Sequence, residues 1–576
     1  MSIPFEVDGV PALFAESSGP LRAGLVFRVG QADEPLARRG ITHLIEHLAL
    51  HDAGAAGHDH NGVTAPDFTV FLTQGTAEEV RSFLAGVGAS LRDLPAGRLP
   101  VEKEILRAEE AAHHGDDEMP VRRYGARGYG LVAYPEFGLA GLGAEDLREW
   151  ADRYVVRGNA ALWITGPQLP DGLRLDLPEG ERQAPPAAWA PLPVTPGHFP
   201  GPDGVVVWDT VVPRETTATV YTRLLSRELR RTLRHENGLS CTAAADHTPL
   251  ADGTTRIVVL ADALPDKQSL VLDGVTGVLD RLRRGEFGDA DLTTVVEQHG
   301  DELAQADRRG DRAPRQAADL LLGRPPADLD TALAQVRAVT RADVTRVALA
   351  AFAAGLLQTP GDTTPGDGWT AVPAVSAEQV AGQAYPSLSV PAHHRVIVGD
   401  DGATLVEGGR LTTVRLDACA AVLAWPDGAR HLIGADGSEI HLEPALFHGL
   451  AAALPDLDRR IPAGLRADMA PRDPKNIPRP RLVLPTVRLP EEPAAPSPSP
   501  AVGPPPSVRR KYLLNLALCA GVLLAVVTGV VDLAEIRWVT GTYPLAGLPA
   551  QLLAMGLVAA RGGWALRELL RLREAR

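Results

Sequence analysis

Apolar and polar positions follow two patterns through roughly the first 355 residues, which predicts strands mixed with helices. Strand-like apolar runs occur at LRAGLVFRVG (21–30), FTVFLTQ (68–74) and TRIVVLAD (255–262). The segment GITHLIEHLAL (40–50) instead has the pattern of a buried amphipathic helix. Together these patterns predict an α+β fold.

An internal repeat divides this part of the chain. The segments 76–94 and 264–282 align without a gap, and each follows an extended apolar run. We therefore expect two tandem homologous α/β units, at 1–182 and 203–355. A proline-rich stretch, QAPPAAWAPLPVTPGHFPGPDG, lies between them and is expected to be a bridge.

A third pattern of short alternating runs with glycine turns follows the two units. Examples are LTTVRL (411–416) and CAAVLAWPDG (419–428), which are typical of a small antiparallel sheet or barrel. We expect a small β-rich domain at 391–465. A barrel with a C-terminal helix resembles a pleckstrin-homology-like module, and a partner-docking domain is the alternative.

The C-terminal part of the sequence predicts a membrane anchor. A proline-rich linker is expected at 466–508, and the segment 509–576 then contains two apolar runs, at 512–531 and 543–560. Arginines flank the outer ends of the runs, so the pair is expected to form a transmembrane hairpin with both ends in the cytoplasm. The N-terminus has no signal-peptide pattern. The predicted location is therefore the cell membrane, multi-pass, with the body facing the cytoplasm.

Composition excludes some classes of protein. The formal net charge of −15 argues against a nucleic-acid partner, which would require a basic surface. The three cysteines, Cys241, Cys419 and Cys519, are scattered, so they predict neither a disulfide framework nor a cysteine-ligated metal.

Two histidines and a glutamate interrupt the amphipathic helix at 40–50. His43 and His47 are four positions apart and share one helix face, with Glu46 next to them. Two imidazoles at that spacing can bind one zinc ion, and a nearby carboxylate can accept a proton from zinc-bound water. The alternative is a helix whose polar residues face solvent.

A zinc centre of this kind needs a third protein ligand from elsewhere. The predicted helix PVEKEILRAEEAAHHGDDE (100–118) offers Glu102, Glu104, Glu109 and Glu110. Glu102 and Glu109 share one helix face because seven residues separate them by about two turns.

The pattern H-x-x-E-H followed by a helix with E-x(6)-E resembles the pitrilysin/insulinase family of zinc metallopeptidases. The resemblance implies Zn²⁺ held by His43, His47 and Glu109. It also implies Glu46 as the general base and Glu102 as a supporting carboxylate behind the ligands. The expected activity is a membrane-anchored zinc metalloendopeptidase that hydrolyses peptides or small proteins.

Two further segments extend the resemblance. NGVTAPDFTVFL (61–72) is similar to the family's substrate-pairing segment, which implies a substrate-binding role for Asn61. LRHENGLS (233–240) is similar to the segment whose arginine holds substrate, here Arg234. Cys241 stands where the family has tyrosine, and the glycine- and histidine-rich HDAGAAGHDHNG (51–62) is expected to be a shortened, flexible loop.

The second unit has no H-x-x-E-H motif and is expected to be metal-free. Family members close a chamber with four such units, so the resemblance implies a homodimer or a partner subunit. The alternative function is a catalytically impaired scaffold that binds peptides or partners at the membrane. Cys241 and the shortened loop favour this alternative, whereas the complete set of metal-site residues favours the enzyme.

Overall fold

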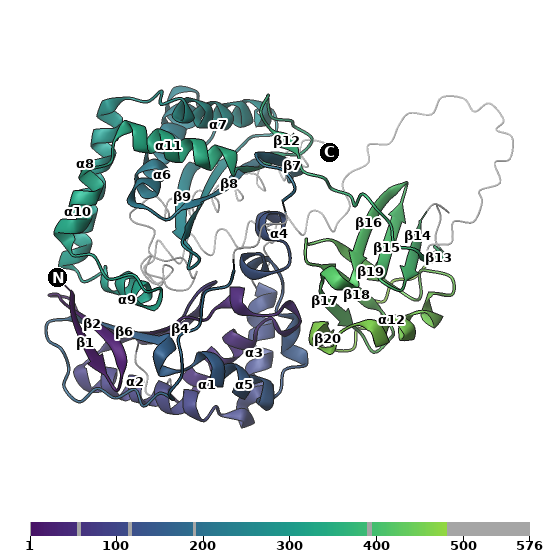
Figure 1. Cartoon of the computed structure of the whole chain (residues 1–576), viewed down its shortest axis with the longest axis horizontal. Coiled ribbons are helices and arrows are strands. Elements are labelled where there is room, and N and C mark those ends of the chain that lie inside the picture. Colours follow the sequence, from purple (N-terminus) through teal and green to yellow (C-terminus); the bar gives the residue numbers. More distant parts are fainter. Residues whose placement is uncertain (1, 54–58, 113–117, 188–191, 389–393, 481–576) are drawn as a thin grey trace, which may run out of the picture.

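The computed structural model describes residues 2–53, 59–112, 118–187, 192–388 and 394–480. Figure 1 shows three parts: a first unit at the bottom, from β1 to β6 (Ser2–Gly166), a second unit at the top, from β7 to β12 (Gly197–Ala371), and a β-rich third region at the right, from β13 to β20 (Gly382–Asp468).

The first unit is built on a six-stranded sheet in the order β1-β2-β6-β3-β5-β4. Only β2 and β6 pair in parallel. Apolar residues of α1, α2, α3 and α5 pack on one face and form a core with the sheet. The bounds are β1 Ser2–Val7, β2 Val10–Glu16, β3 Leu21–Phe27, α1 Ile41–Ala53, β4 Asp59–Thr64, β5 Thr69–Gly75, α2 Ala77–Arg92, α3 Leu99–Ala112, α4 Glu118–Tyr124, α5 Ala144–Tyr154 and β6 Ala160–Gly166.

The opposite face of this sheet is covered by a helix of the second unit. Leu13 and Trp163 of the sheet form one buried cluster with Ala317 and Leu321 of α9 (Ala313–Leu321). Strand β6 is therefore buried at every position, as expected for a strand with both faces covered.

The second unit repeats the strand arrangement of the first. Its sheet has the order β12-β7-β11-β8-β10-β9, and only the β7–β11 and β7–β12 pairs are parallel. Strands β7, β11, β8, β10 and β9 correspond in order and direction to β2, β6, β3, β5 and β4. The aligned repeat segments fall on α2 and α7. The bounds are β7 Gly197–Gly201, β8 Val205–Pro213, α6 Thr216–Leu229, β9 Ala243–Pro249, β10 Thr254–Asp262, α7 Gln268–Arg283, α8 Asp289–Arg308, α10 Leu329–Arg337, α11 Arg341–Ala353, β11 Leu356–Pro360 and β12 Thr370–Ala371.

Two boundaries of the predicted second unit differ from the structure. The proline-rich bridge contains β7, which pairs with β11, and β11 itself lies beyond residue 355. The sequence pattern does not predict β7, because Pro200 has no N–H to donate to a neighbouring strand. Strand β12 pairs with β7 only at Gly197 and His198, so the register does not require a donor at Pro200.

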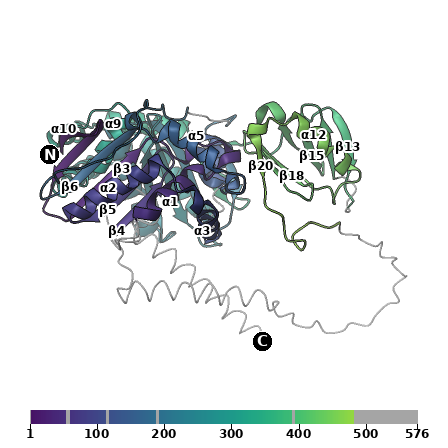
Figure 2. The same cartoon turned by 90° about the horizontal axis from the view of Figure 1, so that it is seen from below.

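The third region consists of two four-stranded sheets, β13-β14-β15-β16 and β19-β18-β17-β20. Figure 2 shows it as a lobe beside the two units. Strand β20 lies inside the segment that is expected to be a linker. It pairs in parallel with β17, so the folded region extends past residue 465. The bounds are β13 Gly382–Pro386, β14 Arg395–Gly399, β15 Gly402–Glu407, β16 Arg410–Arg415, β17 Cys419–Ala424, β18 Arg430–Gly434, β19 Glu439–Leu442, α12 Leu454–Arg460 and β20 Arg466–Asp468.

One face of the third region packs against the first unit. Leu423 and Ile433 of this face share a buried cluster with Leu131 and Tyr134. The backbone N–H of Ala126 also donates to the carbonyl of Ala435 at 3.0 Å. The third region therefore supports the segment of the first unit around residues 126–137.

The predicted location requires a correction. Among the residues that the structure describes, no helix combines the length and the apolar character needed to cross a membrane. The described residues therefore contain no spanning helix of the kind that the predicted multi-pass location in the cell membrane, with the body facing the cytoplasm, requires. The two apolar runs at 512–531 and 543–560 lie outside the described residues.

Candidate metal centre

Helix α1 begins at a fixed point because the buried carboxylate of Glu34 caps it. The backbone N–H groups of Gly40 and Thr42 donate to Glu34 at 3.0 and 2.9 Å, which satisfies amides that a helix start leaves unpaired. Gly40 has φ of 97°, and a Cβ there would lie 2.9 Å from Glu136 Cβ. Glycine is therefore required at this position, and it brings the start of α1 beside Glu136.

The apolar stripe of α1 determines where its histidines lie. Ile41, Leu44 and Leu48 are fully buried in the core of the first unit. His43 and His47 are one turn apart on another face and remain partly exposed, at 26% and 17% of their side-chain areas. Burial of the stripe therefore presents both imidazoles at the protein surface.

Helix α3 brings Glu109 to the two imidazoles. Glu109 Oε2 lies 3.9 Å from His43 Nε2 and 3.7 Å from His47 Nε2. The two rings are nearly perpendicular, at 86°, with centroids 4.8 Å apart. Ligand atoms of a tetrahedral zinc lie about 3.4 Å apart when each is about 2.1 Å from the ion. The arrangement of these three residues therefore fits a zinc ion after small side-chain movements.

Each imidazole has a carboxylate at its other nitrogen. His43 Nδ1 donates to Glu136 Oε1 at 2.9 Å, and His47 Nδ1 lies 3.5 Å from Glu102 Oε2. Such contacts fix the tautomer and leave Nε2 of each ring available to a metal. The structure thus places Glu102 behind His47, and it adds Glu136 behind His43.

Sequence reasoning did not identify Glu136. It follows Pro135 in an irregular segment, far along the chain from the motif, and has no helical spacing to the histidines. Its own backbone N–H donates to Glu110 Oε1 at 2.6 Å, which fixes the segment to the end of α3. Only the folded arrangement brings it to His43.

The carboxylates around His43 determine its protonation in the metal-free protein. Burial by itself lowers the pKa of His43, but the hydrogen bond to Glu136 and the charges of Glu46 and Glu109 raise it to about 9. His43 also lowers the pKa of Glu136, despite the opposing effect of burial. A metal ion at this site must therefore displace a proton from His43.

Glu46 is buried between α1 and β4. Its side chain is almost fully covered, and Thr64 Oγ1 donates to Glu46 Oε2 at 2.8 Å. A Cβ on Gly62 would lie 2.2 Å from Glu46 Oε1, so the absence of a side chain there makes room for the carboxylate. Burial raises the pKa of Glu46, which makes it a better proton acceptor.

Strand β4, which contacts Glu46, is an edge strand of the first sheet. It pairs with β5, and among the described residues no other strand pairs with it. Asn61 lies on β4 but on the opposite sheet face from Gly62 and Thr64, because side chains alternate along a strand. The face of β4 that carries Gly62 and Thr64, and not the Asn61 side chain, lies next to Glu46.

The predicted substrate residue Arg234 lies in the second unit. It is exposed in a π-helical segment, Arg230–Glu236, and its charge acts on the neighbouring Cys241 thiol. Among the described residues, no hydrogen bond or ion pair joins Arg234 to the histidine cluster.

The expected histidine-rich loop is partly regular structure. His51 lies within α1, where its Nδ1 is 4.0 Å from Glu102 Oε1, and His60 lies on β4 with its ring 5.9 Å from that of Phe83. The expectation of a flexible loop is therefore wrong at these two positions. His58 lies outside the described residues.

The chain is similar to known proteins in both sequence and structure. No family model matches the chain. Coenzyme PQQ synthesis protein F of Pseudomonas aeruginosa is 28% identical over 247 residues, which is 35% of this chain and 31% of that protein. The match thus spans about a third of the relative's length.

Solved structures match over a larger part of the chain. The first half of the periplasmic protease PqqL from Escherichia coli has a TM-score of 0.51 at 12% identity, and the match covers 63% of this chain and 92% of that structure. A peptidase M16 inactive domain from Pseudomonas fluorescens has a TM-score of 0.50 at 16% identity, covering 65% of this chain and 100% of that domain. The fold is that of the M16 peptidases.

This M16-like fold confirms the predicted architecture of α/β units. The M16 neighbours include both a protease and an inactive domain, so the M16 fold by itself does not decide the activity. PqqL is a periplasmic protease, which also disagrees with the predicted cytoplasmic, membrane-bound location.

Proposed function

We propose that this protein is a zinc metalloendopeptidase that hydrolyses peptides or small proteins. The observation that carries the proposal is the approach of His43 Nε2, His47 Nε2 and Glu109 Oε2 to one another. The buried Glu46 lies within one helical turn of both histidines. The match to a peptidase-fold protease from Escherichia coli supports it.

In the proposed mechanism, His43, His47 and Glu109 hold the metal, while Glu102 and Glu136 orient the two imidazoles. Zinc, when bound, supplies Lewis acidity that acidifies a water molecule and polarises a peptide carbonyl. Glu46 accepts the proton of the attacking water and delivers it to the leaving amine. Its burial and its hydrogen bond from Thr64 keep the carboxylate in one orientation for both transfers.

The free edge of β4 is the proposed substrate-binding element. An extended peptide that pairs with this edge would add a strand to the first sheet and would run past Glu46. Asn61 and Arg234 are proposed to contact the substrate farther from the metal. Two units form only half of the expected chamber, so a homodimer or a partner subunit is part of the proposal.

A second candidate is a peptide-binding scaffold without hydrolytic activity. A specific observation favours it: one structural neighbour is an inactive M16 domain. Cys241, in place of the family tyrosine, also fits this candidate.

The substitution Glu46→Gln tests the proposed function. It removes the proton acceptor but no metal ligand, so bound zinc should stay near one ion per chain while peptide hydrolysis falls by about 100-fold or more. Metal content and cleavage of a peptide library measure the two effects. The matched control is Glu104→Gln, an exposed glutamate on α3. Wild-type cleavage by the Glu46 variant would refute the proposal, and a wild-type protein that binds zinc and peptides without cutting them would establish the scaffold.

A further inference from the structure

A second cluster of metal-binding side chains lies in the third region, on the hairpin of β18 and β19. His431 and His441 are direct cross-strand partners, and their rings stack with centroids 3.8 Å apart. Glu439 Oε2 accepts a hydrogen bond from His431 Nε2 at 3.0 Å. One ligand atom from each residue lies within 4.8 Å of the other two. The hairpin therefore collects two imidazoles and a carboxylate at one place.

The β-ladder holds these three residues on the same face of the hairpin. Glu439 and His441 are two positions apart on β19, and His431 is opposite His441 on β18, so all three side chains project to one side. The residues between them, Leu432 and Ile440, are fully buried in the core of the third region. Because that core fixes the backbone, the cluster has a preorganised framework.

The exposure of the cluster suits an open metal site. His431 is largely buried, at 7% exposed, whereas Glu439 and His441 reach solvent. His431 is thus the buried ligand, whereas Glu439 and His441 lie where an ion can enter from solvent. A water molecule can then be the fourth ligand. The stacked imidazoles must tilt so that both nitrogens face the ion, which also replaces the His431–Glu439 hydrogen bond.

We propose that His431, Glu439 and His441 form a second divalent-metal site, specific for zinc-type ions and separate from the His43 centre. Two imidazoles with one carboxylate are ligands that Zn²⁺ prefers. The proposal does not depend on the catalytic activity or on metal binding at His43.

The position of the hairpin gives the second site a structural role. Its turn approaches the first unit, since a Cβ on Gly437 would lie 3.6 Å from the Tyr134 hydroxyl and 2.5 Å from Val121. Tyr134 is two residues before Glu136, which holds His43. An ion that ties β18 to β19 would therefore stiffen the surface that supports the Glu136 segment.

The test uses the full chain with the first centre removed by the His43→Ala, His47→Ala double substitution. In this background, Zn²⁺ titration against a chromogenic chelator should show about one ion bound per chain. Co²⁺ should give the visible absorption of a low-symmetry, four-coordinate site. Adding His441→Ala should abolish this binding, and adding Glu439→Gln should weaken it about tenfold or more.

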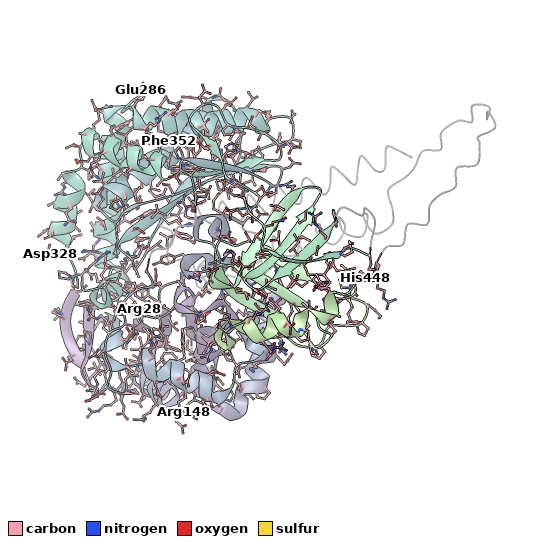
Figure 3. The ribbon with its side chains drawn as sticks, turned by 45° about the vertical axis from the view of Figure 1, so that its right-hand side comes forward. Arg28, Arg148, Glu286, Asp328, Phe352 and His448 are labelled. Atoms are coloured by element: carbon pink, nitrogen blue, oxygen red, sulfur yellow. The ribbon has the colours of Figure 1, made fainter. Side chains whose placement is uncertain are left out.

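His448→Ala is the matched control, because His448, which is marked in Figure 3, is an exposed histidine of the same region and is not a member of the cluster. It should leave binding unchanged. His441 and Glu439 are exposed, so both variants should fold, and far-UV circular dichroism checks this. The absence of bound Zn²⁺ in the double-substituted background would overturn the proposal. Binding that survives His441→Ala would do so too.

Discussion

His43 Nδ1 donates a 2.9 Å hydrogen bond to Glu136, a residue that comes from an irregular segment supported by the third region. The substitution Glu136→Gln keeps the size of the side chain but removes its charge. We expect zinc affinity to fall about 10- to 100-fold, because the carboxylate orients His43 and increases its basicity. Competition with a chelator of known affinity measures the change. Glu104→Gln should have no effect, and unchanged affinity in the Glu136 variant would show that this contact does not support the metal.

Gly62 provides the space that the Glu46 carboxylate occupies. We expect Gly62→Ala to displace Glu46, because the added Cβ would lie 2.2 Å from Oε1 in the present arrangement. Peptide hydrolysis should fall at least about tenfold, while zinc content stays unchanged because no ligand is altered. Gly97→Ala is the control, since a Cβ there meets nothing within 4 Å. A Gly62→Ala variant with normal hydrolysis would mean that Glu46 has another productive position.

Asp67 joins the two units and should make stability depend on pH. It accepts hydrogen bonds from Tyr129 Oη at 2.7 Å and from the backbone N–H of Ala251 at 3.0 Å. Burial raises the pKa of Asp67 to about 6, above its ordinary value of 3.8. The protonated form is thus favoured in the folded state, and the associated stability is present below pH 3.8 and is lost as pH rises through about 6.

The variant Asp67→Asn tests this pH dependence because it lacks the titration. The difference in unfolding temperature, wild type minus variant, should decrease between about pH 4 and pH 7. Differential scanning calorimetry across this range measures it. A difference that is constant with pH would contradict the assignment of the titration to Asp67.

Arg123 of α4 joins the first unit to the second by a buried ion pair. Its guanidinium bonds to the fully buried Asp209 of β8 and donates to the carbonyl of Ala354 at 3.0 Å. Arg123→Met leaves the Asp209 carboxylate with Arg256 as its remaining ion-pair partner. We expect a loss of about 3–5 kcal/mol in the free energy of unfolding. Urea denaturation measures this loss, and Arg148→Ala, at an exposed position marked in Figure 3, should change stability by less than about 0.5 kcal/mol.

The grouping of the candidate site residues on each helix could be predicted from the sequence, because it depends only on local geometry. His43, Glu46 and His47 lie within two turns of one helix, and Glu109 shares a face with Glu102 on another. Helical periodicity places the members of each group on one helix face. The family resemblance, and not periodicity, indicated Glu109 as the third ligand, and its approach to His43 and His47 appears only in the fold. The hairpins of the third region could be predicted for the same reason, because each of them pairs two strands that are adjacent in the sequence.

Other features depend on contacts between distant segments, which periodicity does not reveal. Glu136 reaches His43 because its segment is fixed to the end of α3 and to the third region. The proline-rich segment that contains β7 reads as a bridge in the sequence because proline is rare in strands. Its parallel pairing with β11 appears only in the fold. His51 was expected in a loop, but Ala49 and Ala53 favour continuation of α1.

Helix α9 of the second unit lies on the sheet of the first, and this affects how the chain can be divided. Without α9, residues 1–182 would present the apolar face around Leu13 and Trp163 to water, a surface prone to self-association. The first unit is therefore not an autonomous folding module. Synthesis must continue past Leu321 before that sheet is covered, so the repeat boundary in the sequence is not a place where the protein can be cut into two independent parts.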